Sequence, residues 1–126
     1  MKEFEKWFKK AEGDLIMIQN VIHVKDAPYD LCCFHAQQAS EKYLKAYLIA
    51  KNIAFPYTHN LITLLLLCKH QNDNFKKIEK NCEAVTDFGI SPRYPDDIDD
   101  LTVDDAKKAY EDALAIKAYV ITHFFD

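Results

Sequence analysis

The stretch FHAQQASEKYLKA, residues 34–46, decides the fold of this chain and holds most of its candidate functional residues. On a helical wheel of about 100° per residue, residues 31–51 separate into two faces. The apolar face consists of small residues and tyrosines: Cys32, Ala36, Ala39, Tyr43, Ala46, Tyr47 and Ala50. The opposite face carries a polar stripe: His35, Gln38, Glu41, Lys42 and Lys45, bounded by Leu31, Phe34 and Ile49. Such a stripe is either a binding site or a solvated helix face.

The composition extends the helical prediction to the whole chain. Its 126 residues, 49% of them hydrophobic, suffice for one domain with a single core. Gly13 and Gly89 are the only glycines, valine is sparse, and alanine, leucine, lysine and glutamate are common. The scarcity of glycine and valine and the abundance of the other four residues favour helices over strands. We therefore predict an all-α fold, an up-and-down bundle of four to five helices in a single domain spanning residues 1–126.

The helix boundaries follow from turn and capping residues. Thr58 is the expected N-cap of the third helix, and Thr102 with Asp105 forms a capping signal for the last. Pro92 and Pro95 make regular helix unfavourable between residues 89 and 101. The predicted helices cover about residues 3–25, 29–52, 59–70 and 72–87, and the last runs from residue 102 almost to residue 126.

The charge distribution argues against binding of long nucleic acid through its phosphate backbone. The formal net charge is −4 and Arg93 is the only arginine, whereas such proteins present a basic face. Two lysine clusters alternate with apolar residues at helical spacing, and we interpret both as solvated faces. They are Lys6, Lys9 and Lys10, and Lys76, Lys77 and Lys80.

The cysteines and the N-terminal residues favour a reduced, cytoplasmic location. No apolar signal region opens the chain, and no apolar run has the length needed to cross a bilayer. The four cysteines include no C-x-x-C pair, so we expect buried free thiols and no metal or other cofactor. The acidic run between residues 96 and 105 is interpreted as charge at a helix start rather than as a cation site.

The irregular segment before the last helix is the second candidate site. Arg93 is followed at once by Tyr94; a guanidinium can bind phosphate or carboxylate, and a tyrosine can stack on a base. His59 or His35 together with Arg93 could cleave a phosphodiester without metal. The alternatives are an arginine that pins the loop through an ion pair and histidines with structural roles.

Three segments, in this order, resemble the HEPN domain family: residues 34–46, FPYTHNL at residues 55–61, and RYP at residues 93–95. Trp7, Ala11 and the pair Asp14-Leu15 fit the same pattern, which covers essentially the whole chain. The resemblance implies a small all-α bundle that commonly forms a homodimer. It also implies a neighbouring gene for a minimal nucleotidyltransferase, with this domain binding nucleotides or serving as the substrate-binding partner.

Many HEPN proteins are ribonucleases, some of them toxins of toxin–antitoxin pairs, and carry an arginine and a histidine with four to six residues between them. In this chain Ile98, Asp99 and Asp100 occupy the positions that follow Arg93 at that spacing. The departure favours a non-catalytic binding role. The alternatives are a metal-independent endoribonuclease with an altered site, and an interaction module whose polar stripe lies in a dimer interface.

The ligand-binding residues that we predict combine the polar stripe with the matching family positions. Lys42, Lys45 and Arg93 are expected to meet phosphate, and Tyr94 or Tyr57 to face a base. His35 and Gln38 are expected to supply directional hydrogen bonds. The full set is His35, Gln38, Lys42, Lys45, His59, Arg93 and Tyr94.

Overall fold

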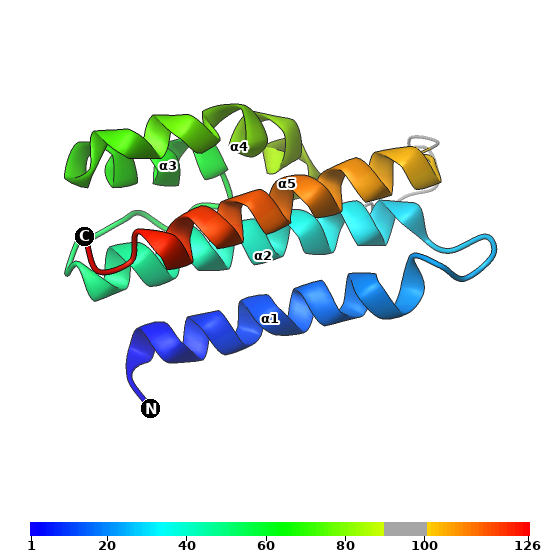
Figure 1. The fold of residues 1–126 in the computed structure, drawn as a ribbon, viewed down its shortest axis with the longest axis horizontal. Helices are drawn as coiled ribbons and strands as arrows, with labels where there is room; N and C mark the ends of the chain where they lie inside the picture. Colours follow the sequence, from blue (N-terminus) through cyan, green and yellow to red (C-terminus); the bar gives the residue numbers. More distant parts are fainter. Residues whose placement is uncertain (90–100) are drawn as a thin grey trace.

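Three long helices run alongside one another, and a layer of shorter helices covers one side of them (Figure 1). The computed structural model describes residues 1–89 and 101–126, and every regular element within them is helical. In chain order these are α1 (Glu3–Val21), α2 (Tyr29–Ala50), α3 (Leu61–Gln71), the 3₁₀ helix η1 (Asp73–Ile78), α4 (Glu79–Val85), the 3₁₀ helix η2 (Thr86–Gly89) and α5 (Val103–Thr122). The chain reverses direction between α1 and α2 and between α3 and η1, and α5 runs opposite to α4, so the predicted all-α up-and-down bundle is confirmed.

The second helix, α2, lies at the centre of the bundle. It packs against α1 on one side, against α5 along its length, and against α3 on a third side. Small residues of its apolar face, including Ala36, Ala39 and Ala46, have no exposed surface and let neighbouring helices approach closely. Tyr43 and Tyr47 fill the core between them. Because α2 is enclosed on most sides, its polar residues must find partners inside the bundle.

Three predicted helix ends are wrong, and one of them is the end of the last helix, because α5 stops at Thr122 rather than close to Asp126. The first helix ends at Val21 rather than near Lys25. The chain then turns through Asp26, whose φ of 56° lies outside the range of a right-handed α-helix. The third helix starts at Leu61 because Asn60, not Thr58, is its N-cap. The Asn60 side chain accepts hydrogen bonds from two backbone N–H groups of the first turn.

The helix predicted for residues 72–87 is divided into η1, α4 and η2. In η1, Phe75 and Ile78 are both buried, and a spacing of three residues places them on one face of a 3₁₀ helix. The third helix is also less enclosed than its run of leucines suggests, since Leu66 is 57% exposed.

Two smaller predictions are confirmed. Thr102 and Asp105 form a reciprocal capping box at the start of α5. All four cysteines are free and buried, and burial raises the pKa of the Cys33 thiol to about 12, which keeps it protonated and unreactive.

Among the described residues, no helix combines the length and the apolar character needed to span a membrane.

Glu12 joins the three long helices at one point. Its carboxylate accepts a hydrogen bond of 2.7 Å from the Tyr43 hydroxyl on α2 and lies 2.9 Å from Lys117 Nζ on α5. The hydrogen bond from Tyr43, followed by that from Lys117, lowers the pKa of Glu12 below its usual 4.5. The folded protein therefore holds this carboxylate ionised more strongly than the unfolded chain does.

The Glu12→Gln variant tests this link. A carboxyl whose pKa is lowered by folding stabilises the protein above its unfolded pKa, and the contribution disappears as pH falls through the folded pKa. We expect Glu12→Gln to be less stable than the wild type at about pH 7, with the difference shrinking at about pH 3. Urea denaturation at both pH values measures this. Glu111→Gln, an exposed change in α5, is the control; a difference that stays constant with pH would contradict the assignment.

Candidate functional site

The polar stripe of α2 is organised around Glu41, whose side chain is only 4% exposed. Its Oε2 lies 3.0 Å from Lys45 Nζ, one turn further along α2. Its Oε1 lies 2.9 Å from Nδ1 of His59. His59 belongs to the link, the segment of residues 51–60 between α2 and α3. A buried carboxylate requires such partners, because the attraction to a cation and the hydrogen bonds offset its loss of hydration. Glu41 therefore ties the link to the central helix.

The ammonium group of Lys45 is enclosed by aromatic rings. The Lys45 side chain is 6% exposed, and its Nζ lies 5.5 Å from the ring centroid of Trp7, 5.7 Å from that of Phe55 and 6.0 Å from that of Tyr57. These distances are within the range of cation–π attraction. Helix α1 and the link thus both contribute to holding this cation beside Glu41.

Gln37 connects the stripe to the start of α3. It is fully buried, and its Nε2 donates to the His59 carbonyl at 2.7 Å and to Glu41 Oε1 at 3.3 Å. Its Oε1 accepts a hydrogen bond from Gln38 Nε2 at 2.7 Å. Gly89, at the end of η2, is tightly packed here: a Cβ on it would lie 2.8 Å from the Gln37 amide. The glycine is needed at this position because the amide is fixed by its hydrogen bonds.

A second cluster joins α2 to α1. Asp14 of α1, itself 8% exposed, accepts from Lys42 Nζ at 2.6 Å and lies 2.9 Å from His35 Nδ1. Both partners are partly buried, with side chains 21% and 28% exposed. This cluster attaches α1 to α2. The Glu41 cluster, made of Glu41, Lys45, His59 and Gln37, attaches the link to α2 in the same way.

The structure brings five of the seven predicted ligand-binding residues into these two neighbouring clusters. Lys42 and His35 share Asp14, Lys45 and His59 share Glu41, and Gln38 reaches Glu41 through Gln37. The remaining two, Arg93 and Tyr94, lie outside the described residues. Since Glu41 and Lys45 are buried, the stripe is not a solvated helix face.

Two residues that organise the clusters had no assigned role in the sequence analysis. Asp14 lies on the buried stripe of α1, three residues after Ala11 and four before Ile18, and a carboxylate at a core position signals a buried partner. Gln37 precedes Glu41 by one helical turn, the spacing at which an amide and a carboxylate interact. Both signals are visible in the sequence.

The side of the Glu41 cluster nearest solvent presents an imidazole and an aromatic ring at the surface. The side chain of His59 is 49% exposed, and Tyr57 is 90% exposed with its ring 5.4 Å from the imidazole. Within the described residues no group of three or more histidines, cysteines or acids is close enough to hold a metal ion. A pocket of about 210 Å³ opens beside the histidine, lined by His59, Asn60, Thr86, Asp87 and Gly89.

Removing one partner of the buried Glu41–Lys45 pair should be costly. We expect Glu41→Ala to lower the free energy of unfolding by about 3 kcal/mol, because it leaves the Lys45 ammonium buried without a counter-ion. The double variant Glu41→Gln/Lys45→Met should be more stable than Glu41→Gln alone. Asp73→Ala, which removes the exposed Asp73–Lys76 pair, should cost less than about 1 kcal/mol. Equal losses for Glu41→Ala and Asp73→Ala in urea denaturation would contradict the buried pair.

Comparison with known proteins agrees with this architecture. The HEPN domain family model matches residues 4–123. The crystal structure of ST0689, an archaeal HEPN homologue, is 25% identical in sequence with a TM-score of 0.74, over 98% of this chain and 99% of that one. TT1696 from Thermus thermophilus is 24% identical with a TM-score of 0.77, over 97% and 98% of the two chains, and supports the fold alone. No curated protein sequence matches significantly. With nearly its whole length covered by the family model, the chain belongs to the HEPN domain family.

Proposed function

We propose that this protein is a non-catalytic HEPN domain that binds a nucleotide or nucleotide-like ligand. In this proposal it acts as the substrate-binding partner of a minimal nucleotidyltransferase encoded nearby. The observation that carries the proposal is the Glu41 cluster, which fixes His59 at the surface beside the exposed ring of Tyr57. A fixed imidazole can donate to or accept from a polar ligand, and a neighbouring ring can stack on a base.

The sequence supports binding rather than cleavage. Catalysis of phosphodiester cleavage needs a group that stabilises developing charge and one that moves protons, held at a defined separation. The family's arginine–histidine spacing is missing after Arg93, where Ile98, Asp99 and Asp100 stand. His59 is instead held by Glu41 as part of a structural network. Arg93 and Tyr94 remain the predicted contacts for phosphate and base from the segment before α5.

Nucleotide titration tests the proposed function. We expect ATP or GTP to bind saturably to the purified protein in calorimetry, and Arg93→Ala or His59→Ala to weaken binding by about tenfold, the loss of one charge-assisted hydrogen bond. Lys107→Ala, an exposed change in α5, should leave the affinity unaltered. Absence of binding at millimolar nucleotide would contradict the proposal. Cleavage of total RNA in EDTA by the wild type, lost in His59→Ala, would favour the ribonuclease alternative.

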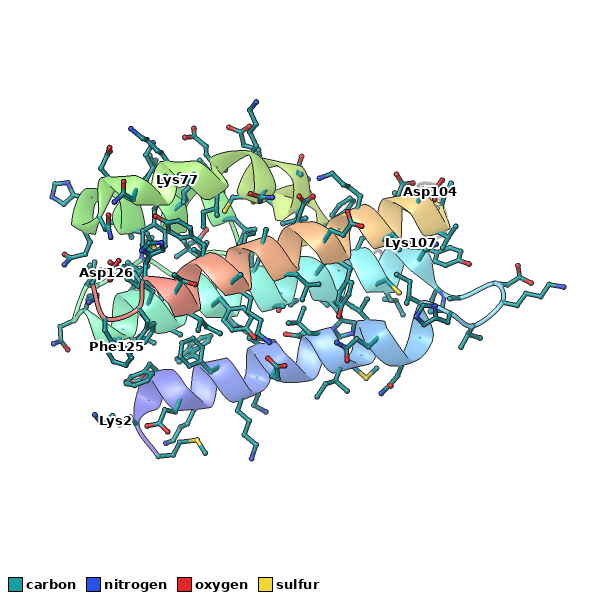
Figure 2. All side chains as sticks on the ribbon, viewed as in Figure 1. Lys2, Lys77, Asp104, Lys107, Phe125 and Asp126 are labelled. Carbon is teal, nitrogen blue, oxygen red and sulfur yellow. The ribbon has the colours of Figure 1, made fainter. Side chains whose placement is uncertain are left out.

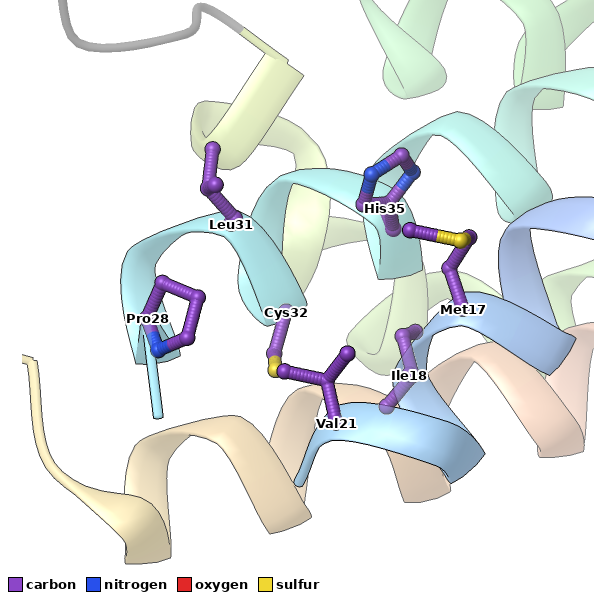
Figure 3. A pocket seen from close by; sticks show the side chains of 7 residues that line it. All are labelled: Met17, Ile18, Val21, Pro28, Leu31, Cys32 and His35. Atoms are coloured by element: carbon purple, nitrogen blue, oxygen red, sulfur yellow. The ribbon is translucent and has the colours of Figure 1, made fainter. Parts of the chain in front are cut away.

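We further propose that the protein is a homodimer, joined where the end of α1 meets the start of α2. Exposed apolar side chains gather there: Met17 is 50% exposed, Val24 56% and Leu31 41%. Met17 and Leu31 line a small apolar cavity of about 60 Å³ (Figure 3). Its walls come from Met17, Ile18, Val21, Pro28, Leu31, Cys32 and His35. Exposed apolar side chains grouped around a cavity are typical of protein–protein contact surfaces.

Analytical ultracentrifugation tests the dimer. We expect a dimer for the wild type and a monomer for Leu31→Asp, because a carboxylate buried in an apolar contact loses its hydration without gaining a partner. Leu66→Asp, which places the same charge on an exposed leucine of α3, is the matched control and should remain dimeric. A monomeric wild type at high protein concentration would remove the proposal, and a monomeric Leu66→Asp would place the interface elsewhere.

A further inference from the structure

Three lysines on the first half of α1 differ from the lysines of the polar stripe in pairing with no carboxylate of the described residues. Lys42 and Lys45 each lie within 3.0 Å of a buried acid. Lys6, Lys9 and Lys10 are exposed and form no ion pair with any residue in the ranges 1–89 and 101–126. Lys6 and Lys10 are one helical turn apart, where like charges repel each other. An anion between them would relieve this repulsion.

Two of these lysines, Lys6 and Lys10, lie between two adjoining pockets. The first pocket, of about 150 Å³, is lined by Lys6, Trp7, Lys10 and Lys42. The second, of about 470 Å³, is lined by Met1, Lys6, Lys9, Lys10 and Gly13. Lys6 and Lys10 belong to both, so a ligand that spans the ridge contacts both ammonium groups. Their charges favour an anionic ligand there, and the acids of the first turn, Glu3 and Glu5, line neither pocket.

Trp7 gives the first pocket a flat aromatic wall. The indole is partly buried, and its position is fixed from the protein side by the Lys45 ammonium, 5.5 Å from the ring centroid. A planar ring can stack on such a surface, as bases stack on aromatic side chains in proteins that bind nucleic acid. A pocket with an indole wall and two ammonium groups therefore fits a ligand that combines a planar ring with phosphate.

Gly13 in the second pocket has no structural explanation in the bundle. It lies in the interior of α1 without positive φ, and a Cβ added to it would meet no atom within 4 Å. Glycine inside a helix is less stable than alanine because the unfolded chain is more flexible. Neither a turn nor a close helix contact compensates this cost here. A ligand that approaches the backbone closely would account for the missing side chain.

We propose that a nucleoside phosphate, free or at the end of a single-stranded RNA, binds across α1 with its base on Trp7 and its phosphate on Lys6 and Lys10. Gly13 leaves room for the phosphate-bearing part, and Lys42 borders the base. The inference rests on the proposed function, that the protein binds a nucleotide, and adds Trp7, Lys6 and Lys10 to the residues expected to hold it. It also moves the phosphate contacts from the lysines of the stripe, which are neutralised by Asp14 and Glu41, to those of α1.

The test uses two readouts on the full chain, because Trp7 is its only tryptophan. Calorimetry detects ATP bound anywhere, whereas the indole fluorescence reports binding at Trp7. We expect ATP to change the fluorescence saturably. Adenosine, without phosphate, and inorganic triphosphate, without a ring, should each bind about tenfold more weakly, since each lacks one of the two contacts. A 5′-phosphorylated oligoadenylate that binds more tightly than ATP identifies the RNA end as the source; equal affinity identifies the free nucleotide.

Variants separate this site from its surroundings. Lys6→Ala/Lys10→Ala should weaken ATP binding by about tenfold or more. Lys77→Ala/Lys80→Ala removes the same charge from the exposed cluster on the α4 side, across the molecule from α1 (Figure 2), and should leave the affinity unaltered. Gly13→Ala should raise the melting temperature. Gly13→Glu should weaken binding more than Gly13→Gln, because it adds a negative charge beside the phosphate.

Each remaining outcome is decisive. ATP binding in calorimetry with unchanged Trp7 fluorescence and an unaltered affinity in Lys6→Ala/Lys10→Ala would overturn the inference and leave the proposed function standing. Equal losses for the α1 pair and the Lys77/Lys80 pair would also overturn it, because the effect would then follow net charge alone. No binding by either readout at millimolar ATP would overturn the proposed function and this inference together.

Discussion

The buried carboxylate of Glu41 is the interaction on which the arrangement of the polar residues depends. It lies on the central helix, enclosed by the bundle, and an ionised group there is tolerated only with partners at hydrogen-bond distance. Those partners come from two directions, Lys45 along α2 and His59 from the link. The position of the link, of the aromatic rings around Lys45 and of the start of α3 therefore follows from one charge that must be neutralised.

The sequence was sufficient to predict the fold because its signals are local. The scarcity of glycine, the helical spacing of apolar residues and the capping box of Thr102 each act within one or two helical turns. The start of the third helix and the continuity of the fourth were mispredicted because another local interaction is more favourable there. Asn60 caps α3 with two hydrogen bonds where Thr58 was expected, and the core positions of Phe75 and Ile78 favour a 3₁₀ helix over a continuous α-helix.

The candidate site was only partly predictable because its partners are distant in sequence. A helical wheel placed His35, Lys42 and Lys45 on one face but could not show that acids of α1 and α2 neutralise them. Asp14 is 28 residues from Lys42, and only the packing of α1 on α2 brings them together. Patterns within one helix therefore show which polar residues share a face, whereas tertiary contacts decide which of their charges remain available to a ligand.

This distinction also changes the interpretation of the two lysine clusters. In the sequence both clusters alternate with apolar residues and look like solvated faces. In the structure Lys76 of one cluster pairs with Asp73, whereas Lys6 and Lys10 of the other line two pockets, one of which has Trp7 as a wall. Equal charge and equal exposure thus do not make the two clusters equivalent. An ammonium group is available to a ligand when it forms no ion pair and lines a concave surface, and among the described residues Lys6 and Lys10 meet both conditions.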